Sequence, residues 1–150
     1  MMKIRFFNGL SLDKEAEPKN IKDGIVLKEE IPTWVRGVRH HKFIVLRVPG
    51  EDLTVVIGPE WDYMRSSYAH ARIAELFFPQ LAQNLREMRK VVHGGGMLTV
   101  VRTQISPEEV SFAAKMSGDS ASFGKYPRLI FEGEHSQIIS EALDLTVEFG

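Results

Sequence analysis

A histidine at the start of an expected helix is the residue of this chain best suited to acid–base chemistry. Segment 66–73 has the sequence SSYAHARI. Ser66 and Ser67 are good N-cap residues, because a side-chain oxygen can accept from a free amide of the first turn. His70 would then lie within that turn, beside amides and a helix dipole that favour a bound anion. The segment therefore predicts a site where an imidazole meets a phosphate and moves a proton, although a surface histidine without a role fits the same pattern.

Two further stretches have the composition of anion-binding segments. Gly94, Gly95 and Gly96 interrupt the strand-like run 91–102. Glycines inside a strand mark a bulge, or a close approach by a ligand or another backbone. Segment 117–125, SGDSASFGK, has small and polar residues that can turn amides and hydroxyls toward an anion, and an ordinary surface loop has the same composition. The triplet is not a P-loop, because no Gly-Lys-Ser/Thr follows it.

The remaining candidates for catalytic or metal sites lack the required spacing. His40 and His41 are adjacent on an expected strand, so their side chains point to opposite faces. His93 and His135 have no ligand spacing to each other. Ser120 lacks the Gly-x-Ser-x-Gly elbow of a hydrolase nucleophile. The chain has no cysteine, which excludes disulfides and thiol chemistry. We expect neither a metal ion nor another cofactor.

The composition is typical of a soluble globular protein. The 150 residues suit one domain, residues 1–150, and 43% of them are apolar and 26% charged. A net charge of −1 with scattered basic residues argues against a nucleic-acid partner. The absence of cysteine fits the reducing cytoplasm, where we expect the protein. The apolar N-terminal piece is too short for a signal sequence or a membrane span, so no membrane partner is expected.

Hydrophobic patterning predicts a mixed α/β domain in which these residues are held by strands and two main helices. Segment 40–48 is apolar almost throughout, as a central strand buried on both faces would be. A helix is expected from about 67 to about 90, bent or broken at Pro79. Segment 13–24 is polar and indicates a surface loop. The other expected elements are strands at 3–7, 53–57, 91–102, 110–116 and 145–149, a short candidate strand at 25–27 and a helix at 136–143, which give a mixed sheet of roughly six strands.

Four stretches, in this order, resemble the phosphohistidine phosphatase family, also known as the Janus/Ocnus family. Segment 42–48, KFIVLRV, matches the family's early strand with its lysine. Segment 68–73, YAHARI, is similar to the family motif Tyr-His-Ala-Asp-Ile. The glycine triplet at 94–96 follows, and 118–125 resembles the family's Gly-Tyr-Ser-x-x-Phe/Tyr-Gly loop. The resemblance covers the chain from Lys42 to the C-terminus, whereas residues 1–40 are poorly matched.

The resemblance implies a small α/β domain, with six strands and two helices, that hydrolyses phosphohistidine or a related phosphoramidate without a metal. On this basis His70 is the catalytic general base or nucleophile, and Lys42 supplies positive charge near the phosphoryl group. Backbone amides, and for Ser120 also the hydroxyl, would contact the phosphate. The residues expected to bind phosphate are Ala71, Arg72, Gly96, Ser120 and Ser122. The expected partner is a phosphorylated protein or a small phosphoramidate, and the sequence does not define the oligomeric state.

Three residues depart from the family pattern. Ala69 is an extra residue between the tyrosine and the histidine, and Arg72 replaces an acidic residue. Met97 follows the glycine triplet where the family has an arginine thought to bind phosphate. A methionine there removes a bidentate anion donor. The alternative function is therefore a non-catalytic member of the same fold that binds a phosphorylated ligand or partner protein.

Overall fold

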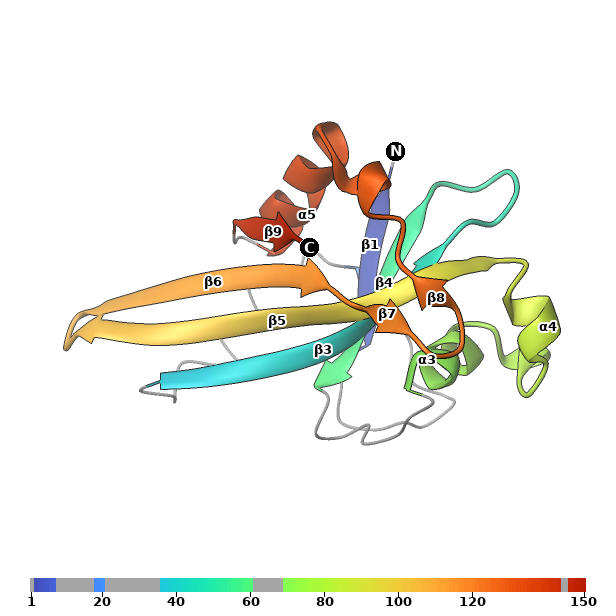
Figure 1. Ribbon diagram of the computed structural model, residues 1–150, viewed down its shortest axis with the longest axis horizontal. Helices are drawn as coiled ribbons and strands as arrows, with labels where there is room; N and C mark the ends of the chain where they lie inside the picture. Colours follow the sequence, from blue (N-terminus) through green and yellow to red (C-terminus); the bar gives the residue numbers. More distant parts are fainter. Residues whose placement is uncertain (1, 8–17, 21–35, 61–68, 144–145) are drawn as a thin grey trace.

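The described part of the chain forms one mixed sheet with helices packed on its two faces (Figure 1). The structure is a computed structural model that describes residues 2–7, 18–20, 36–60, 69–143 and 146–150. The mixed α/β class predicted from the sequence is confirmed. Ser66 and Ser67, expected as the N-cap of the long helix, lie outside the described residues, and so does the short strand expected at 25–27.

The main path of the sheet has seven strands, one more than expected, in the order β2-β1-β4-β3-β5-β6-β9. The added strand is β2, which lies inside the polar segment predicted as a loop and pairs antiparallel with β1. A three-residue strand has no periodicity of its own, so only its pairing partner reveals it. The bounds are β1 (Lys3–Phe7), β2 (Pro18–Asn20), β3 (Arg36–Leu46), β4 (Thr54–Glu60), β5 (Val92–Ser106), β6 (Glu109–Ser117) and β9 (Val147–Phe149). Two short strands, β7 (Asp119–Ser120) and β8 (Gly124–Lys125), pair with each other, and β8 also pairs with β5.

Strand β3 is the centre of the sheet, as its continuous apolar run predicted. It pairs antiparallel with β4 on one side and with β5 on the other. Phe43, Ile44, Val45 and Leu46 are at most 2% exposed. Because side chains alternate along a strand, Phe43 and Val45 enter one core and Ile44 and Leu46 enter the other.

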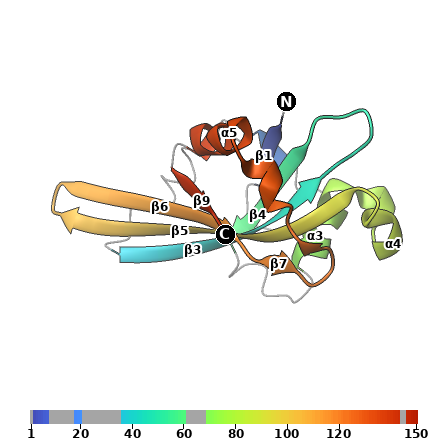
Figure 2. The ribbon, with the colours of Figure 1, turned by 45° about the horizontal axis from the view of Figure 1, so that its top comes forward.

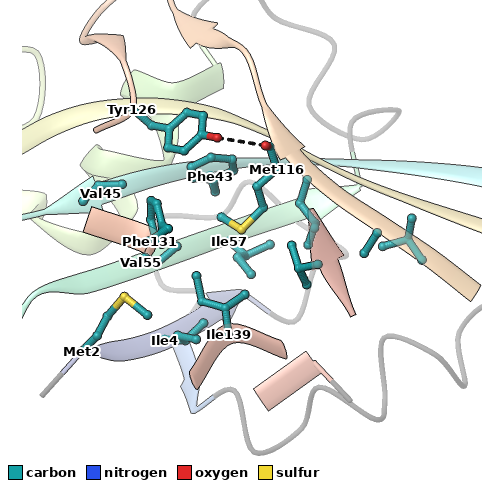
Figure 3. Close-up of a cluster of buried hydrophobic side chains, with 14 residues drawn as sticks. Met2, Ile4, Phe43, Val45, Val55, Ile57, Met116, Tyr126, Phe131 and Ile139 are labelled. Atoms are coloured by element: carbon teal, nitrogen blue, oxygen red, sulfur yellow. Dashed lines mark hydrogen bonds between the residues drawn. The ribbon is translucent and has the colours of Figure 1, made fainter. Parts of the chain in front are cut away.

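The two faces of the sheet are covered by different helices. Helix α5 (Glu134–Leu143) packs on the face of Phe43 through Ile139 (Figure 3). There the Tyr126 ring meets the Phe43 ring edge to face at 5.3 Å, and the Tyr126 hydroxyl donates to Met116 O at 2.9 Å. Helix α3 (Ala69–Phe77) packs on the opposite face, which carries Ile44. We call this second surface the α3 face.

The expected helix at 67–90 is divided at Pro79, as the missing amide of proline predicts. Helix α3 ends at Phe77, a 3₁₀ turn η2 (Pro79–Leu81) follows, and α4 (Leu85–Met88) is a single further turn. Gln83, between η2 and α4, has a left-handed φ of 64°. Another 3₁₀ turn, η3 (Arg128–Phe131), precedes α5. None of the helices in the described ranges is long and apolar enough to cross a membrane.

Strands β5 and β6 form a long hairpin that projects from the helices together with β3 (Figure 2). At its open end β6 stops opposite Met97, and the chain turns through Gly118 into β7. Strand β8 then takes the place of β6 beside β5, through pairing of Lys125 with Gly95. This exchange of strands puts segment 117–125 against the glycine triplet.

A methyl group at Gly94 should destabilise the fold far more than one at Gly50. Both glycines have positive φ, at 96° and 81°, but a Cβ at Gly94 would lie 2.3 Å from Lys125 O whereas a Cβ at Gly50 would meet nothing within 4 Å. Gly50→Ala should therefore cost about 1–2 kcal/mol of unfolding free energy from backbone strain alone, and Gly94→Ala more than about 3 kcal/mol. Urea unfolding of both variants measures the difference. Equal losses would contradict the close packing of β8 on β5.

Candidate functional site

His70 lies in the first turn of α3, as expected, and its ring is held against the sheet. The residue is 5% exposed, with Ala69 and Ile73 buried beside it on the side of the helix that meets the sheet. His70 Nε2 lies 2.8 Å from Gly96 O. A carbonyl oxygen only accepts, so the neutral ring carries its proton on Nε2. The lone pair of the imidazole is therefore on Nδ1, which is the nitrogen able to accept a proton.

The glycine triplet makes this contact possible. A Cβ at Gly95 would lie 2.7 Å from His70 Cδ2, and a Cβ at Gly96 would lie 2.4 Å from Ser117 O. The sequence left open whether the triplet marks a bulge or a close approach by another group, and the structure has both. The pairing of β3 with β5 shifts register between Ile44 and Leu46, and other groups of the chain approach the triplet closely. The Gly96 carbonyl oxygen accepts the hydrogen bond from the His70 ring.

Lys42 reaches the same region from β3. It pairs with Met97 of β5, and Met97 pairs in turn with Ser117 of β6, so the three residues form a row across the sheet. Lys42 is two residues from Ile44 and so lies on the α3 face. Its charge acts on the His70 imidazole, which places the two side chains predicted as catalytic in one electrostatic neighbourhood.

Asp119 joins this neighbourhood, and sequence reasoning did not assign it a role. It is the first residue of β7 and is exposed. Its carboxylate acts on both Lys42 and His70. Asp119 is the one acidic residue in 117–125, which could have drawn attention to it in the sequence. An acidic side chain, however, is not expected where an anion binds.

The pKa of His70 lies below its ordinary value. Burial is the main cause, since it disfavours the imidazolium, and the charge of Lys42 acts in the same direction. The hydrogen bond to Gly96 O and the charge of Asp119 partly oppose the decrease. The pKa of Lys42 is also lowered by burial, against the raising effect of Asp119. His70 is therefore a neutral imidazole at neutral pH, with its lone pair on Nδ1.

The turn between β7 and β8 is held by Ser120. The Ser120 hydroxyl oxygen accepts from the amides of Ser122 and Phe123, each at 3.2 Å. Both serines are buried, at 4% and 8% exposed. The Ser122 carbonyl accepts from Arg89 Nε at 3.0 Å, which ties the turn to the end of α4. The Ser122 amide, expected to face phosphate, is thus used within the turn.

The predicted site residues form two adjacent groups. His70, Lys42 and Gly96 meet at the glycine triplet. Ala71, Arg72 and Ser122 instead line a cavity of about 360 Å³ beside α3, and Arg72 Nη1 donates to Glu75 Oε2 at 3.1 Å. Ser120 lies between the groups, because its chain neighbours pair with the triplet and its hydroxyl binds Ser122. Within the described ranges, no three His, Asp or Glu side chains gather as a metal-binding group.

The two charges beside His70 should move its pKa in opposite directions. Lys42→Met removes a neighbouring cation and should raise the pKa of His70, whereas Asp119→Asn removes an anion and should lower it. In the wild type, a pKa below the unfolded value of about 6.5 means that His70 stabilises the fold above that pH and loses this contribution as the pH falls below it.

NMR titration of the imidazole in the three proteins gives the pKa values, and urea unfolding between pH 5 and 8 gives the pH dependence of stability. Shifts of the same sign in both variants would show that one of these charges does not face the ring.

The chain was compared with family models, with curated proteins and with solved structures, and none of the three comparisons found a match.

Proposed function

We propose that this protein is a metal-independent phosphatase that hydrolyses the P–N bond of phosphohistidine or a related phosphoramidate. The observation that carries the proposal is the bond from His70 Nε2 to Gly96 O, in a ring whose pKa is lowered. It supplies a neutral imidazole with a defined tautomer, next to the cation of Lys42. The order of the four sequence stretches that resemble the phosphohistidine phosphatase family supports the same reaction.

The chemistry needs one base and one cation. His70 Nδ1 takes a proton from water as the water oxygen forms a bond to phosphorus. The P–N bond breaks, its electron pair stays on the leaving nitrogen, and that nitrogen takes up a proton, so the products are phosphate and the free amine or imidazole. Lys42 stabilises the negative charge on the phosphoryl oxygens. Because the phosphoramidate bond is already labile, a positioned base that contributes about 10²–10⁴-fold is sufficient for useful turnover.

His70→Ala should reduce phosphate release by about 10²–10⁴-fold, because the base is lost. Release from phosphohistidine and from phosphoramidate is measured with EDTA present, and the wild-type activity should survive it. His93→Ala is the matched control, since His93 is exposed and outside the His70–Lys42 pair, and it should retain activity within about twofold. The acid limb of kcat/KM should have its inflection below about 6.5, the ordinary pKa of histidine. A wild type that releases no phosphate from either substrate would refute the enzymatic proposal.

The second candidate is a protein that binds a phosphorylated ligand without hydrolysing it. The residues beside Lys42 favour this candidate. Its partner on β5 is the uncharged Met97, and the carboxylate of Asp119 acts on it. Among the described residues, Lys42 is the cation whose charge acts on His70, whereas phosphoryl transfer generally uses several positioned donors.

Adding a guanidinium at position 97 should strengthen phosphate binding. Met97→Arg places a bidentate donor beside Lys42, and we expect the Kd of inorganic phosphate to fall by about tenfold, equivalent to about 1.4 kcal/mol. Met97→Leu keeps the apolar character and should bind as the wild type does. Isothermal titration calorimetry at fixed salt compares the three proteins. Equal affinity of the Arg and Leu variants would show that position 97 does not face the anion.

A further inference from the structure

Within the described residues, three separate parts of the chain line a cavity of about 360 Å³ beside α3. Helix α3 contributes one wall, the segment from Gln83 through α4 a second, and the turn between β7 and β8 a third. Its size is within the range of pockets that hold small ligands or single side chains. The lining residues are Ala71, Arg72, Glu75, Gln83, Leu85, Met88 and Ser122.

The walls are fixed by contacts outside the cavity. Met88 is 1% exposed and belongs to the core under α3. Asn84 Oδ1 accepts from the Glu87 amide and so caps α4. Gln83, just before that cap, is held in a left-handed conformation that residues other than glycine rarely adopt. Arg89 joins the end of α4 to the Ser122 carbonyl at 3.0 Å. These contacts join the walls of the cavity to the core and to one another.

The cavity lies beside the reaction site. Ala71, in its wall, directly follows His70 in α3. In the wall formed by the turn between β7 and β8, the Ser122 amide donates to the Ser120 hydroxyl. Ser120 pairs with Gly124 of β8. The next residue of β8, Lys125, pairs with Gly95 of the glycine triplet. The backbone of Gly95 faces the His70 ring. The cavity wall is therefore joined to the His70 turn through Ala71 and to the glycine triplet through the turn between β7 and β8.

The lining selects for an uncharged, apolar group. Leu85, Met88 and Ala71 present hydrocarbon, and the charged side chains of the described lining, Arg72 and Glu75, form an ion pair at 3.1 Å. A charged ligand group would have to compete with that pair, whereas an apolar group gains from leaving water. A free phosphoramidate carries no apolar group, but a peptide carries side chains next to its phosphorylated residue.

We propose that this cavity receives a large apolar side chain, such as leucine, adjacent to the phosphorylated residue of a protein substrate. The identity of the phosphorylated residue rests on the proposed function. The substrate class is accordingly a protein segment with an apolar residue beside its phosphohistidine, in preference to a small phosphoramidate.

Peptide binding tests the cavity without requiring turnover. Two fluorescent peptides carry a non-hydrolysable phosphonate analogue of phosphohistidine and differ only in having leucine or glycine next to it. Wild-type protein should bind the leucine peptide about tenfold to hundredfold more tightly, as expected for burial of one leucine side chain. Leu85→Trp fills the cavity and should remove this preference. Leu129→Trp is the matched control, since Leu129 is 74% exposed on η3, and it should keep the preference.

Leu85→Ala covers the case in which the tryptophan variant does not fold. It removes an apolar contact without adding bulk and should reduce the preference for the leucine peptide to a few-fold. Equal affinity of the wild type for the two peptides would overturn the proposal, as would a preference that persists in both Leu85 variants. Failure of the wild type to bind either peptide would overturn it together with the proposed function. A leucine preference without phosphate release from the corresponding phosphohistidine peptide would support the cavity and refute the phosphatase.

Discussion

The structure around the site depends on how closely the His70 ring approaches the backbone of β5. A side chain at position 95 would overlap the ring, and one at position 96 would overlap the end of β6, so only glycine allows helix, strand and loop to meet there. The approach also supplies the ring with a hydrogen-bond acceptor at Gly96, without which a buried imidazole N–H would be left unsatisfied. The same backbone contact therefore packs α3, fixes the tautomer of His70 and brings segment 117–125 to the site.

The electrostatics follow from that packing. Burial of the ring makes its protonated form costly, and the neighbouring Lys42 adds to this cost, while Asp119 acts against it. The result is an imidazole kept neutral, which is the form that the proposed general base requires. Lys42 is itself partly desolvated, and Asp119 supports its charge. Asp119 thus opposes the lowering of the pKa of both His70 and Lys42.

The turn between β7 and β8 connects the surroundings of His70 to the neighbouring cavity. Ser120 shapes this turn by accepting from two of its amides, and Arg89 anchors it to α4. Arg72, which sequence reasoning placed at the phosphate, is instead paired with Glu75 in the wall of the cavity. Residues expected to surround one anion are therefore divided between a polar group at His70 and a largely apolar cavity.

Much of the framework could be predicted from local sequence patterns. The buried run of β3, the antiparallel partner β4, the division of the long helix at Pro79 and the place of His70 in a first helical turn all follow from hydrophobic patterning and from the geometry of proline and helix starts. Only the tertiary structure decided which residues meet. Lys42 comes beside Met97 through strand register across a long stretch of chain, and Asp119 joins His70 because β8 replaces β6 beside β5. Periodicity reports which face of an element is buried, but strand register and side-chain pairing depend on contacts between distant segments, and these carry no local signal.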